Sequence, residues 1–162
     1  MTRIVIFGNS GSGKSTLAAK LARESALGHL DLDTLAWEPV SPPVRRSVAK
    51  SRESISHFMD RNENWVIEGC YADLLEFTLE KTTKAIYLSL PIEDCVENAR
   101  SRPWEPHKYE SKEAQDANLD MLITWIRQYE SRNDTFSKAA HEQLFNQFSG
   151  PKVRFSSNEQ RT

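Results

Sequence analysis

Short apolar runs alternate with amphipathic segments along most of this chain. Residues 3–7, 65–67 and 85–90 are runs of strand length, rich in β-branched and aromatic side chains. Between these runs, apolar residues recur every three to four positions, which is the spacing of one face of a helix. Strands that alternate with helices in this way predict a parallel sheet covered by helices on both faces.

The pattern places five strands and six helices along the chain. The predicted strands are residues 3–7, 28–33, 65–67, 85–90 and 153–155. The predicted helices begin at about residue 14, span 42–61 and 72–78, run from 91 to about 101, and continue at 119–129 and 136–148. For the second helix, Ser41 is the expected N-cap and Pro42 the first helical residue.

One polar stretch breaks this alternation. Residues 102–117 contain prolines and charged side chains without an apolar stripe, which predicts a mobile lid. The segment 37–61, a turn-rich stretch followed by a helix, is the expected binding region for a second substrate. We treat residues 1–162 as a single domain, since 162 residues suffice for one core.

Composition limits the classes of function. Charged residues make up 27% of the chain and apolar residues 38%, which is ordinary for a soluble globular protein. The formal net charge of −2 argues against a protein built mainly to hold nucleic acid. No apolar run approaches the roughly 18 residues that a membrane span requires, so we expect a cytoplasmic protein without membrane contact. Cys70 and Cys95 match no metal-binding spacing.

The segment after the first strand carries the strongest chemical signal. Residues 8–15 match G-x-x-x-x-G-K-[ST], the phosphate loop, with Gly8, Gly13, Lys14 and Ser15 at its fixed positions. A strand before it and a helix after it complete the required context. Backbone N–H groups would cradle phosphates, Lys14 would reach the β- and γ-phosphates, and Ser15 would hold Mg²⁺. The expected ATP-binding residues are Gly8, Ser10, Gly11, Ser12, Gly13, Lys14, Ser15 and Thr16.

Three acidic residues follow two of the other predicted strands. Asp31 and Asp33 close the second strand, and Glu68 closes the third. Ligands of parallel sheets bind at the carboxyl ends of the strands, so these acids converge on the phosphate loop. We expect Asp33 to orient an acceptor hydroxyl, and Asp31 and Glu68 to hold Mg²⁺ through its waters. The alternative is that each acid only caps a helix or lies in a loop.

Phosphoryl transfer also requires positive charge around the moving phosphate. Arg100, Arg102 and Arg132 are the candidates on the lid side, although each is also compatible with a solvated helix charge. On the acceptor side, a tryptophan suits a ring and an arginine suits an anion. The residues expected to contact the acceptor there are Asp33, Trp37, Arg45, Arg46 and Gly69.

Together these residues resemble the P-loop small-molecule kinases, the group that contains adenylate and shikimate kinases. Asp31-x-Asp33 is similar to the paired acids of shikimate kinases, which implies roles in holding Mg²⁺ and contacting the acceptor hydroxyl. Val66-Ile67-Glu68-Gly69 is similar to the acid–glycine turn of nucleoside monophosphate kinases, and Arg100 and Arg102 match arginines that enter a short lid. Two features depart from these kinases: Cys70 replaces the second glycine of the shikimate-type turn, and the adenylate kinase Gly-Phe-Pro-Arg segment is absent.

A closer likeness is to the adenylate-kinase-like proteins labelled DNA topology modulation proteins. It rests on Leu32-Asp33-Thr34-Leu35-x-Trp37, on Trp65-Val66-Ile67-Glu68-Gly69-x-Tyr71 and on Gly150-Pro151-Lys152-Val153. The resemblance implies a three-layer α/β P-loop NTPase fold with a five-stranded parallel sheet in the order 2-3-1-4-5 and a short lid.

These expectations combine into an ATP- and Mg²⁺-dependent phosphotransferase that moves the γ-phosphate to a small-molecule or nucleotide acceptor. The main alternative is an ATP-binding regulatory protein with slow ATPase activity that acts on a protein or DNA partner. A DNA-acting ATPase is disfavoured by the acidic balance and because strand four ends in Ser89-Leu90-Pro91 rather than in acids. No Asn-Lys-x-Asp segment is present to bind guanine, which makes adenine the expected base.

Overall fold

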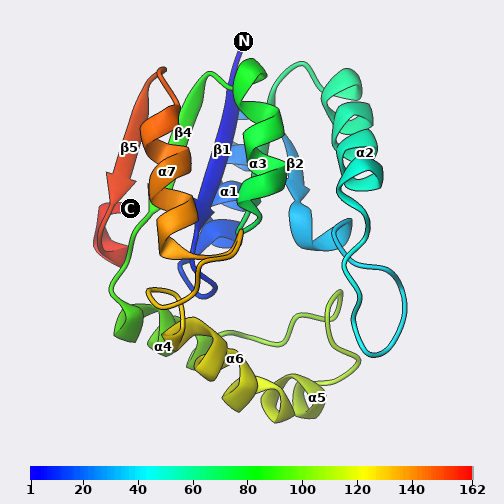
Figure 1. Cartoon of the computed structure of the whole chain (residues 1–162), viewed down its shortest axis with the longest axis vertical. Helices are drawn as coiled ribbons and strands as arrows, with labels where there is room; N and C mark the ends of the chain where they lie inside the picture. Colours follow the sequence, from blue (N-terminus) through cyan, green and yellow to red (C-terminus); the bar gives the residue numbers. More distant parts are fainter. Residues whose placement is uncertain (162) are drawn as a thin grey trace.

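The computed structural model describes residues 1–161 and shows one parallel sheet between two layers of helices (Figure 1). The sheet order is β2-β3-β1-β4-β5, which confirms the predicted order. The strands are β1 Arg3–Gly8, β2 Gly28–Asp31, β3 Trp65–Gly69, β4 Lys84–Leu88 and β5 Lys152–Phe155. All neighbouring pairs are parallel, so the carboxyl ends of the strands share one edge.

The central strand β1 explains why the sheet is covered on both faces. Its side chains alternate between two apolar clusters, with Val5 and Phe7 in one and Ile4 and Ile6 in the other. The first cluster is closed by α2 (Val48–Arg61), α3 (Ala72–Thr78) and α7 (Lys138–Gln147), and the second by α1 (Lys14–Ser25), α4 (Ile92–Arg100) and α6 (Leu119–Arg127). Because both faces of β1 must be buried, its sequence is continuously apolar from Ile4 to Phe7 rather than alternating.

Seven α-helices surround or extend the sheet in the described part of the chain. They are α1 Lys14–Ser25, α2 Val48–Arg61, α3 Ala72–Thr78, α4 Ile92–Arg100, α5 Lys112–Ala117, α6 Leu119–Arg127 and α7 Lys138–Gln147. Short 3₁₀ turns occur at η1 Leu32–Thr34, η2 Leu79–Lys81 and η3 Asn158–Arg161. Within residues 1–161, no helix is long and apolar enough to cross a membrane.

The helix expected at 42–61 begins later than the sequence suggested. Ser47 is its N-cap, and the Ser47 side chain accepts a hydrogen bond from the N–H of Lys50. The preceding residues fold back on themselves, since the N–H of Arg46 donates to the carbonyl of Ala36 at 2.8 Å. An antiparallel bridge between Trp37 and Arg45 completes this loop. Backbone pairing therefore overrides the helix-start signal of Ser41-Pro42.

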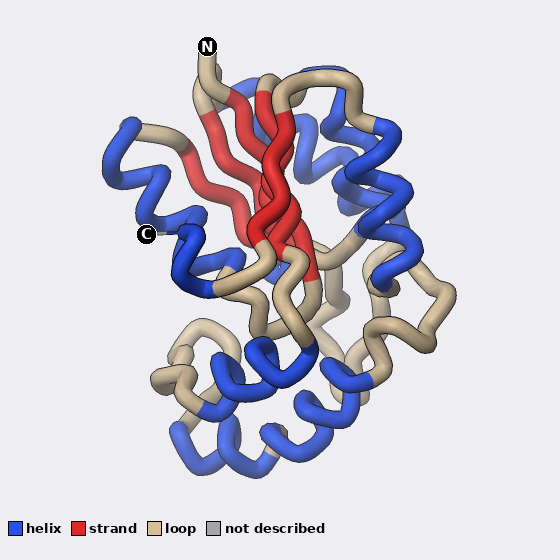
Figure 2. The backbone as a smooth tube through the Cα atoms, turned by 90° about the vertical axis from the view of Figure 1, so that its left-hand side faces the viewer, coloured by secondary structure: helices blue, strands red, loops and turns tan. Residues whose placement is uncertain are grey.

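Two smaller differences concern the ends of elements. The second strand stops at Asp31, and η1 takes the next three residues, so Asp33 lies in a turn. The predicted lid contains the short helix α5, which Ser111 caps by accepting from the N–H of Ala114 at 3.0 Å. Figure 2 shows the helices of this region gathered beyond one end of the sheet. The lid therefore lies at the end of the sheet where a ligand would bind.

Candidate functional site

The phosphate loop joins β1 to α1 and has the backbone that its glycines predict. Gly11 and Gly13 have φ angles of 78° and 90°, in the left-handed region that glycine adopts without strain. A Cβ atom at Gly11 would lie only 2.4 Å from the carbonyl oxygen of Cys95 in α4. The loop therefore packs so closely against α4 that a side chain at this position would displace it.

A cavity of about 480 Å³ opens beside this loop. Lys14 lies in its wall, and its Nζ atom donates to the carbonyl oxygen of Asn9 at 2.8 Å, inside the loop itself. Many of the residues predicted from the sequence line this cavity: Ser10, Gly11, Gly13, Lys14, Ser15, Thr16, Asp33, Glu68, Gly69 and Arg102. The phosphate loop, the strand ends and the lid thus share a single cavity.

The predicted pair Asp31 and Glu68 lies side by side on neighbouring strands. The two residues are in register between β2 and β3. Burial, followed by the negative charges of Glu68 and Asp33, raises the pKa of Asp31 to about 6. Close carboxylates of this kind repel one another when ionised, so a bound cation would be favoured here.

Glu68 has a partner that the sequence did not indicate. Its side chain is almost fully buried, and its Oε2 atom lies 2.9 Å from Nε2 of His29. The hydrogen bond to Glu68 is the largest influence on His29 and raises the pKa of the imidazole, although burial opposes it. His29 is two residues before Asp31 on the same strand, a spacing that places both side chains on one face of β2.

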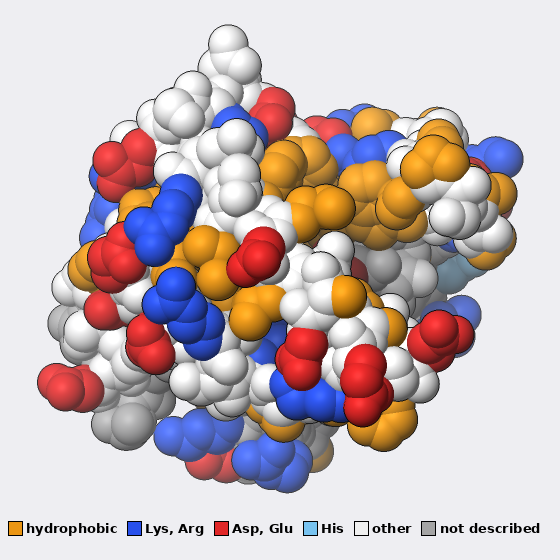
Figure 3. Space-filling view, turned by 90° about the horizontal axis from the view of Figure 1, so that it is seen from below, with side chains coloured by type: hydrophobic (Ala, Val, Ile, Leu, Met, Phe, Trp, Pro, Cys, Tyr) orange, Lys and Arg blue, Asp and Glu red, His pale blue; other side chains and the backbone are white. Residues whose placement is uncertain are grey.

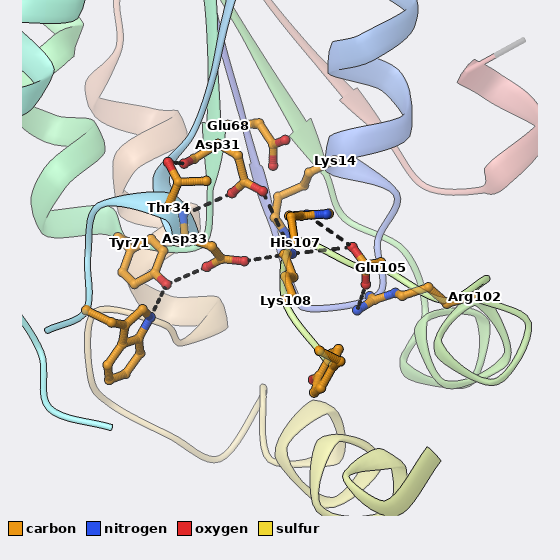
Figure 4. Close-up of polar contacts among 12 residues, drawn as sticks. Lys14, Asp31, Asp33, Thr34, Glu68, Tyr71, Arg102, Glu105, His107 and Lys108 are labelled. Atoms are coloured by element: carbon orange, nitrogen blue, oxygen red, sulfur yellow. Dashed lines mark hydrogen bonds and ion pairs between the residues drawn. The ribbon is translucent and has the colours of Figure 1, made fainter. Parts of the chain in front are cut away.

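Asp33 is held from two directions, as Figure 4 shows. The hydroxyl of Tyr71 donates to its Oδ1 atom at 2.5 Å, and the ammonium of Lys108 donates to Oδ2 at 3.1 Å. Burial acts to raise the pKa of Asp33, but Lys108, Tyr71 and Lys14 together outweigh it, and the net pKa is lowered. Asp33 is therefore an ionised carboxylate with a defined orientation.

The lid supplies charged groups to this cavity (Figure 4). Besides Asp33, the ammonium of Lys108 lies 3.8 Å from Asp31 and 3.6 Å from Glu105. Burial opposes the charge of Lys108, yet the carboxylates of Asp33, Asp31 and Glu105 raise its pKa above the ordinary value. Arg102 ion-pairs with Glu105 at 3.2 Å. Lys108 could not be identified from the sequence, because a polar lid has no periodicity that singles out one lysine.

The two arginines predicted at the entry to the lid lie in different surroundings. Arg102 follows the end of α4 and lines the cavity. Arg100, in the last turn of α4, pairs with Glu97 at 3.8 Å and is half exposed. Arg100 is not among the residues that line the cavity. Of the two, Arg102 is the one that a ligand in the cavity would meet.

The remaining predicted cation of the lid side, Arg132, packs against α6. Its guanidinium lies over the ring of Trp125, 3.6 Å from the centroid, and donates to the carbonyl oxygen of Trp125 at 2.6 Å. Burial is the largest influence on this guanidinium and lowers its pKa. Arg132 therefore braces the chain between α6 and α7 and lies outside the cavity lining.

Three residues were expected to stack on a ring of the acceptor or to bind its negative charge. All three contact other side chains of the protein instead. The guanidinium of Arg45 lies 5.1 Å from the centroid of the Tyr71 ring and pairs with Asp73 at 3.3 Å. Arg46 lies 3.9 Å from a carboxylate oxygen of Glu38. The indole N–H of Trp37 donates to the hydroxyl of Tyr71 at 2.8 Å. Trp37 and Arg45 therefore contact Tyr71, Arg46 lies beside Glu38, and none of the three lines the cavity.

The donor set suits magnesium bound together with phosphates. Among the described residues, no group of three or more His, Cys, Asp and Glu side chains is arranged to hold a metal ion. Magnesium needs few protein ligands in such sites, because it keeps several waters and binds substrate phosphates. Ser15, Asp31 and Glu68 offer a hydroxyl and two carboxylates, which are the hard oxygen donors that it prefers.

A second buried network supports the wall of the cavity from behind. His141, with no exposed surface, lies 2.8 Å from the carbonyl oxygen of Cys70 through Nε2 and 2.7 Å from the hydroxyl of Tyr129 through Nδ1. The hydroxyls of Tyr87 and Tyr129 are hydrogen-bonded to each other at 2.8 Å. Burial also raises the pKa of the Cys70 thiol, which lines the cavity, to about 12, and a raised pKa favours the protonated thiol.

The face of the molecule beyond the sheet end is mixed in character. Figure 3 shows basic and acidic side chains interspersed there, with apolar side chains between them. Local ion pairs account for part of this pattern, such as Arg127 with Glu93 and Lys112 with Asp116. Exposed ion pairs of this kind add little to stability.

Comparison with known proteins gives one family match. A family model described as "AAA domain" matches residues 4–118. The curated relative "Uncharacterized protein YqaC" from Bacillus subtilis (strain 168) is 25% identical over 157 residues, covering 93% of this chain and 86% of YqaC.

The chain was also compared with solved structures. The unliganded structure of a sugar kinase from Janibacter sp. HTCC2649 superposes with a TM-score of 0.55 at 16% identity, covering 99% of this chain and 90% of the kinase. Shikimate kinase from Bacteroides thetaiotaomicron gives a TM-score of 0.45 at 20% identity, over 90% of this chain and 97% of that enzyme. The superposition on the sugar kinase shows that the fold is that of the P-loop kinases.

Proposed function

Because this chain belongs to the AAA domain family and has a P-loop kinase fold, we propose that it is an ATP-dependent phosphotransferase. In this proposal the γ-phosphate of ATP passes to a hydroxyl group of a small-molecule or nucleotide acceptor. ATP binds at the phosphate loop, and the acceptor hydroxyl lies next to Asp33.

One observation carries the proposal: Lys14 and Asp33 line the same cavity. A phosphate held by the loop and a hydroxyl held by Asp33 would therefore face each other in one space. Phosphoryl transfer depends mainly on such positioning and on charge stabilisation, rather than on covalent chemistry by the protein.

The remaining groups have roles that follow from their charge. Loop N–H groups and Lys14 bind the phosphates, while Ser15, Asp31 and Glu68 hold Mg²⁺ directly or through its waters. When bound, the ion neutralises negative charge on the phosphates. Arg102 and Lys108, which line the cavity from the lid side, add positive charge near the transferred group.

The state of Asp33 determines what it does to the acceptor. Its lowered pKa makes it a weaker base than an ordinary carboxylate. Phosphoryl transfer places little demand on early proton removal, because its transition state is loose. Asp33 therefore accepts a hydrogen bond from the hydroxyl, aims its oxygen at the phosphorus, and receives the proton as the new bond forms.

The first experiment measures ADP release from Mg-ATP with a panel of nucleosides, nucleoside monophosphates, hydroxy acids and sugars. Lys14→Ala serves as the blank, and Asp33→Asn keeps the shape of the side chain while removing its charge. Asp60→Asn is the matched control, because Asp60 lies exposed on α2. We expect at least one acceptor to stimulate release, with the stimulation lost in Asp33→Asn and kept in Asp60→Asn.

Slow release that is the same with every acceptor would overturn this proposal. If that release also disappeared in Lys14→Ala, the protein would be an ATP-binding switch, and its partner would be a macromolecule. Stimulation that survives in Asp33→Asn would leave a kinase but would remove Asp33 from the acceptor site.

A further inference from the structure

The hydroxyl of Tyr71 lies at the centre of a hydrogen-bonded chain that ends on Asp33. The proposed function gives no role to the other two members of this chain, Tyr71 and Trp37. Tyr71 directly follows the turn after β3 and precedes α3, and only 1% of it is exposed. Its Oη atom is 2.8 Å from the indole nitrogen of Trp37 and 2.5 Å from Oδ1 of Asp33. Trp37 and Asp33 belong to one segment and Tyr71 to another, and Figure 4 shows Tyr71 beside Asp33.

The direction of this chain follows from the donors available. An indole N–H can only donate, so the oxygen of Tyr71 accepts the hydrogen bond from Trp37. The hydroxyl proton of Tyr71 is then directed to the carboxylate of Asp33, which can only accept. Burial and the charge of Asp33 raise the pKa of Tyr71, which keeps that proton in place.

Packing fixes the tyrosine ring on two sides. The guanidinium of Arg45 lies over the ring at 5.1 Å, and Phe136 contacts it edge-on with centroids 5.3 Å apart. Asp33, by contrast, has a side chain that is 42% exposed and lies in a short 3₁₀ turn. The rigid partner is therefore Tyr71, and the group that needs support is Asp33.

The other contacts of Asp33 come from charged groups on different elements. Lys108 approaches from the lid, and the positive charge of Lys14 in α1 helps to lower the pKa of the carboxylate. Asp31 accepts from the N–H of Asp33 at 2.9 Å. Because residues 102–117 are predicted to form a mobile lid, we expect Lys108 to leave the carboxylate when the lid opens. Tyr71 lies between β3 and α3, in the body of the protein, so its hydrogen bond would persist.

We propose that Tyr71, oriented by Trp37, is a positioning residue that aims the carboxylate of Asp33 at the acceptor hydroxyl. The inference rests on the proposed function. It assigns Trp37 to the orientation of Tyr71 rather than to direct stacking on the acceptor. It also gives a role to the contact between the segments 32–37 and 68–71, because the Tyr71 hydroxyl is hydrogen-bonded to both Trp37 and Asp33.

The test is a double-mutant cycle on acceptor-dependent transfer, using an acceptor found with the panel above. Tyr71→Phe removes only the hydroxyl, and we expect a fall in kcat of about 10- to 100-fold, the range for a lost hydrogen bond to a charged group. The KM for Mg-ATP should change by less than about 2-fold, since the phosphate loop is untouched. In the Asp33→Asn background the same substitution should have almost no further effect, because its target is gone.

Two further variants separate positioning from general damage. Thr78→Val removes another buried hydroxyl, from α3, that bonds only to the backbone oxygen of Leu75 at 2.7 Å. Both Thr78→Val and Tyr71→Phe should lower the melting temperature, but only Tyr71→Phe should lower kcat. Trp37→Phe leaves Tyr71 intact but removes its orienting donor, and should give a smaller fall in kcat of the same kind.

The outcomes distinguish this inference from the proposed function. If no acceptor stimulates transfer in the wild-type protein, both fail together. If transfer occurs and Tyr71→Phe keeps kcat within about 2-fold, or its effect multiplies with that of Asp33→Asn, the inference alone fails. A fall in kcat that Thr78→Val reproduces would also overturn it.

Discussion

The buried chain from Tyr87 through Tyr129 and His141 to the carbonyl of Cys70 makes the stability of this protein depend on pH. The carbonyl can only accept, so Nε2 of His141 carries the proton and donates to it. Nδ1 then accepts from the hydroxyl of Tyr129, which in turn accepts from Tyr87. This directed chain requires a neutral imidazole, and a second proton on His141 would place a charge in the core.

The size of the effect follows from the shift in pKa. Burial lowers the pKa of His141 to about 4, although the bond to Cys70 opposes the shift, whereas an unfolded histidine has a pKa of about 6.5. Between these values the unfolded state binds a proton that the folded state does not. The free energy of unfolding therefore falls by about 1.4 kcal/mol for each unit of pH lost below 6.5. Between pH 7 and pH 5 the loss amounts to about 2 kcal/mol.

The measurement compares urea unfolding of the wild-type protein and His141→Gln at pH 7, 6 and 5. Glutamine can still hydrogen bond but does not titrate, and every other titrating group is common to both proteins. The wild type should lose about 2 kcal/mol more than the variant between pH 7 and pH 5. Equal m-values would show that the two unfold alike. Parallel stability curves, within about 0.5 kcal/mol, would refute the assignment of His141 as a buried neutral base.

Two more predictions test the loop and the lid. Gly11→Ala places a Cβ atom 2.4 Å from the carbonyl of Cys95 at a left-handed φ, so we expect a loss of about 1–3 kcal/mol in thermal unfolding and greatly weakened ATP binding in calorimetry. Unchanged binding would mean that the loop can move away from α4. Lys108→Met should speed hydrogen exchange of lid amides about 5-fold, since its partly buried ion pair with Asp33 contributes roughly 1 kcal/mol. Lys112→Met, which breaks only an exposed pair within α5, is the control and should have little effect.

The sequence predicted the fold and the phosphate loop because both are encoded locally. The loop needs glycines at fixed positions between a strand and a helix, and all of these signals lie within one short segment. Apolar runs and helical spacing set the strands and helices. The edge at which the functional side chains gather then follows from parallel pairing alone.

The partners of Asp33 could not be predicted in the same way. Tyr71 is 38 residues away in the chain and Lys108 is 75 residues away, and neither spacing produces a local pattern. Arg100 and Arg102 show the same difficulty over a short distance. They looked equivalent in the sequence, but α4 ends between them, so Arg100 stays on the helix surface while Arg102 turns into the cavity.

The start of α2 shows how tertiary pairing overrides a local preference. Ser41 and Pro42 satisfy the rules for a helix N-terminus, yet the bridge between Trp37 and Arg45 holds this segment as a loop. The loop places Trp37 against Tyr71, a contact that a helix starting at residue 42 would not require. The segment that departs from the local preference for a helix start therefore lies beside the proposed acceptor site.

The side chain of Asn9 ties the phosphate loop to the helix that follows the lid. Its amide donates to the carbonyl oxygen of Ile126 in α6, and Ile126 is itself fully buried in the core beside α4. Helix α6 is thus anchored to the body, so we expect any closure over a ligand to involve the segment between α4 and α6. Closure of so short a lid would bury little apolar surface. Ligand binding should therefore change the heat capacity by little more than the burial of the ligand itself requires.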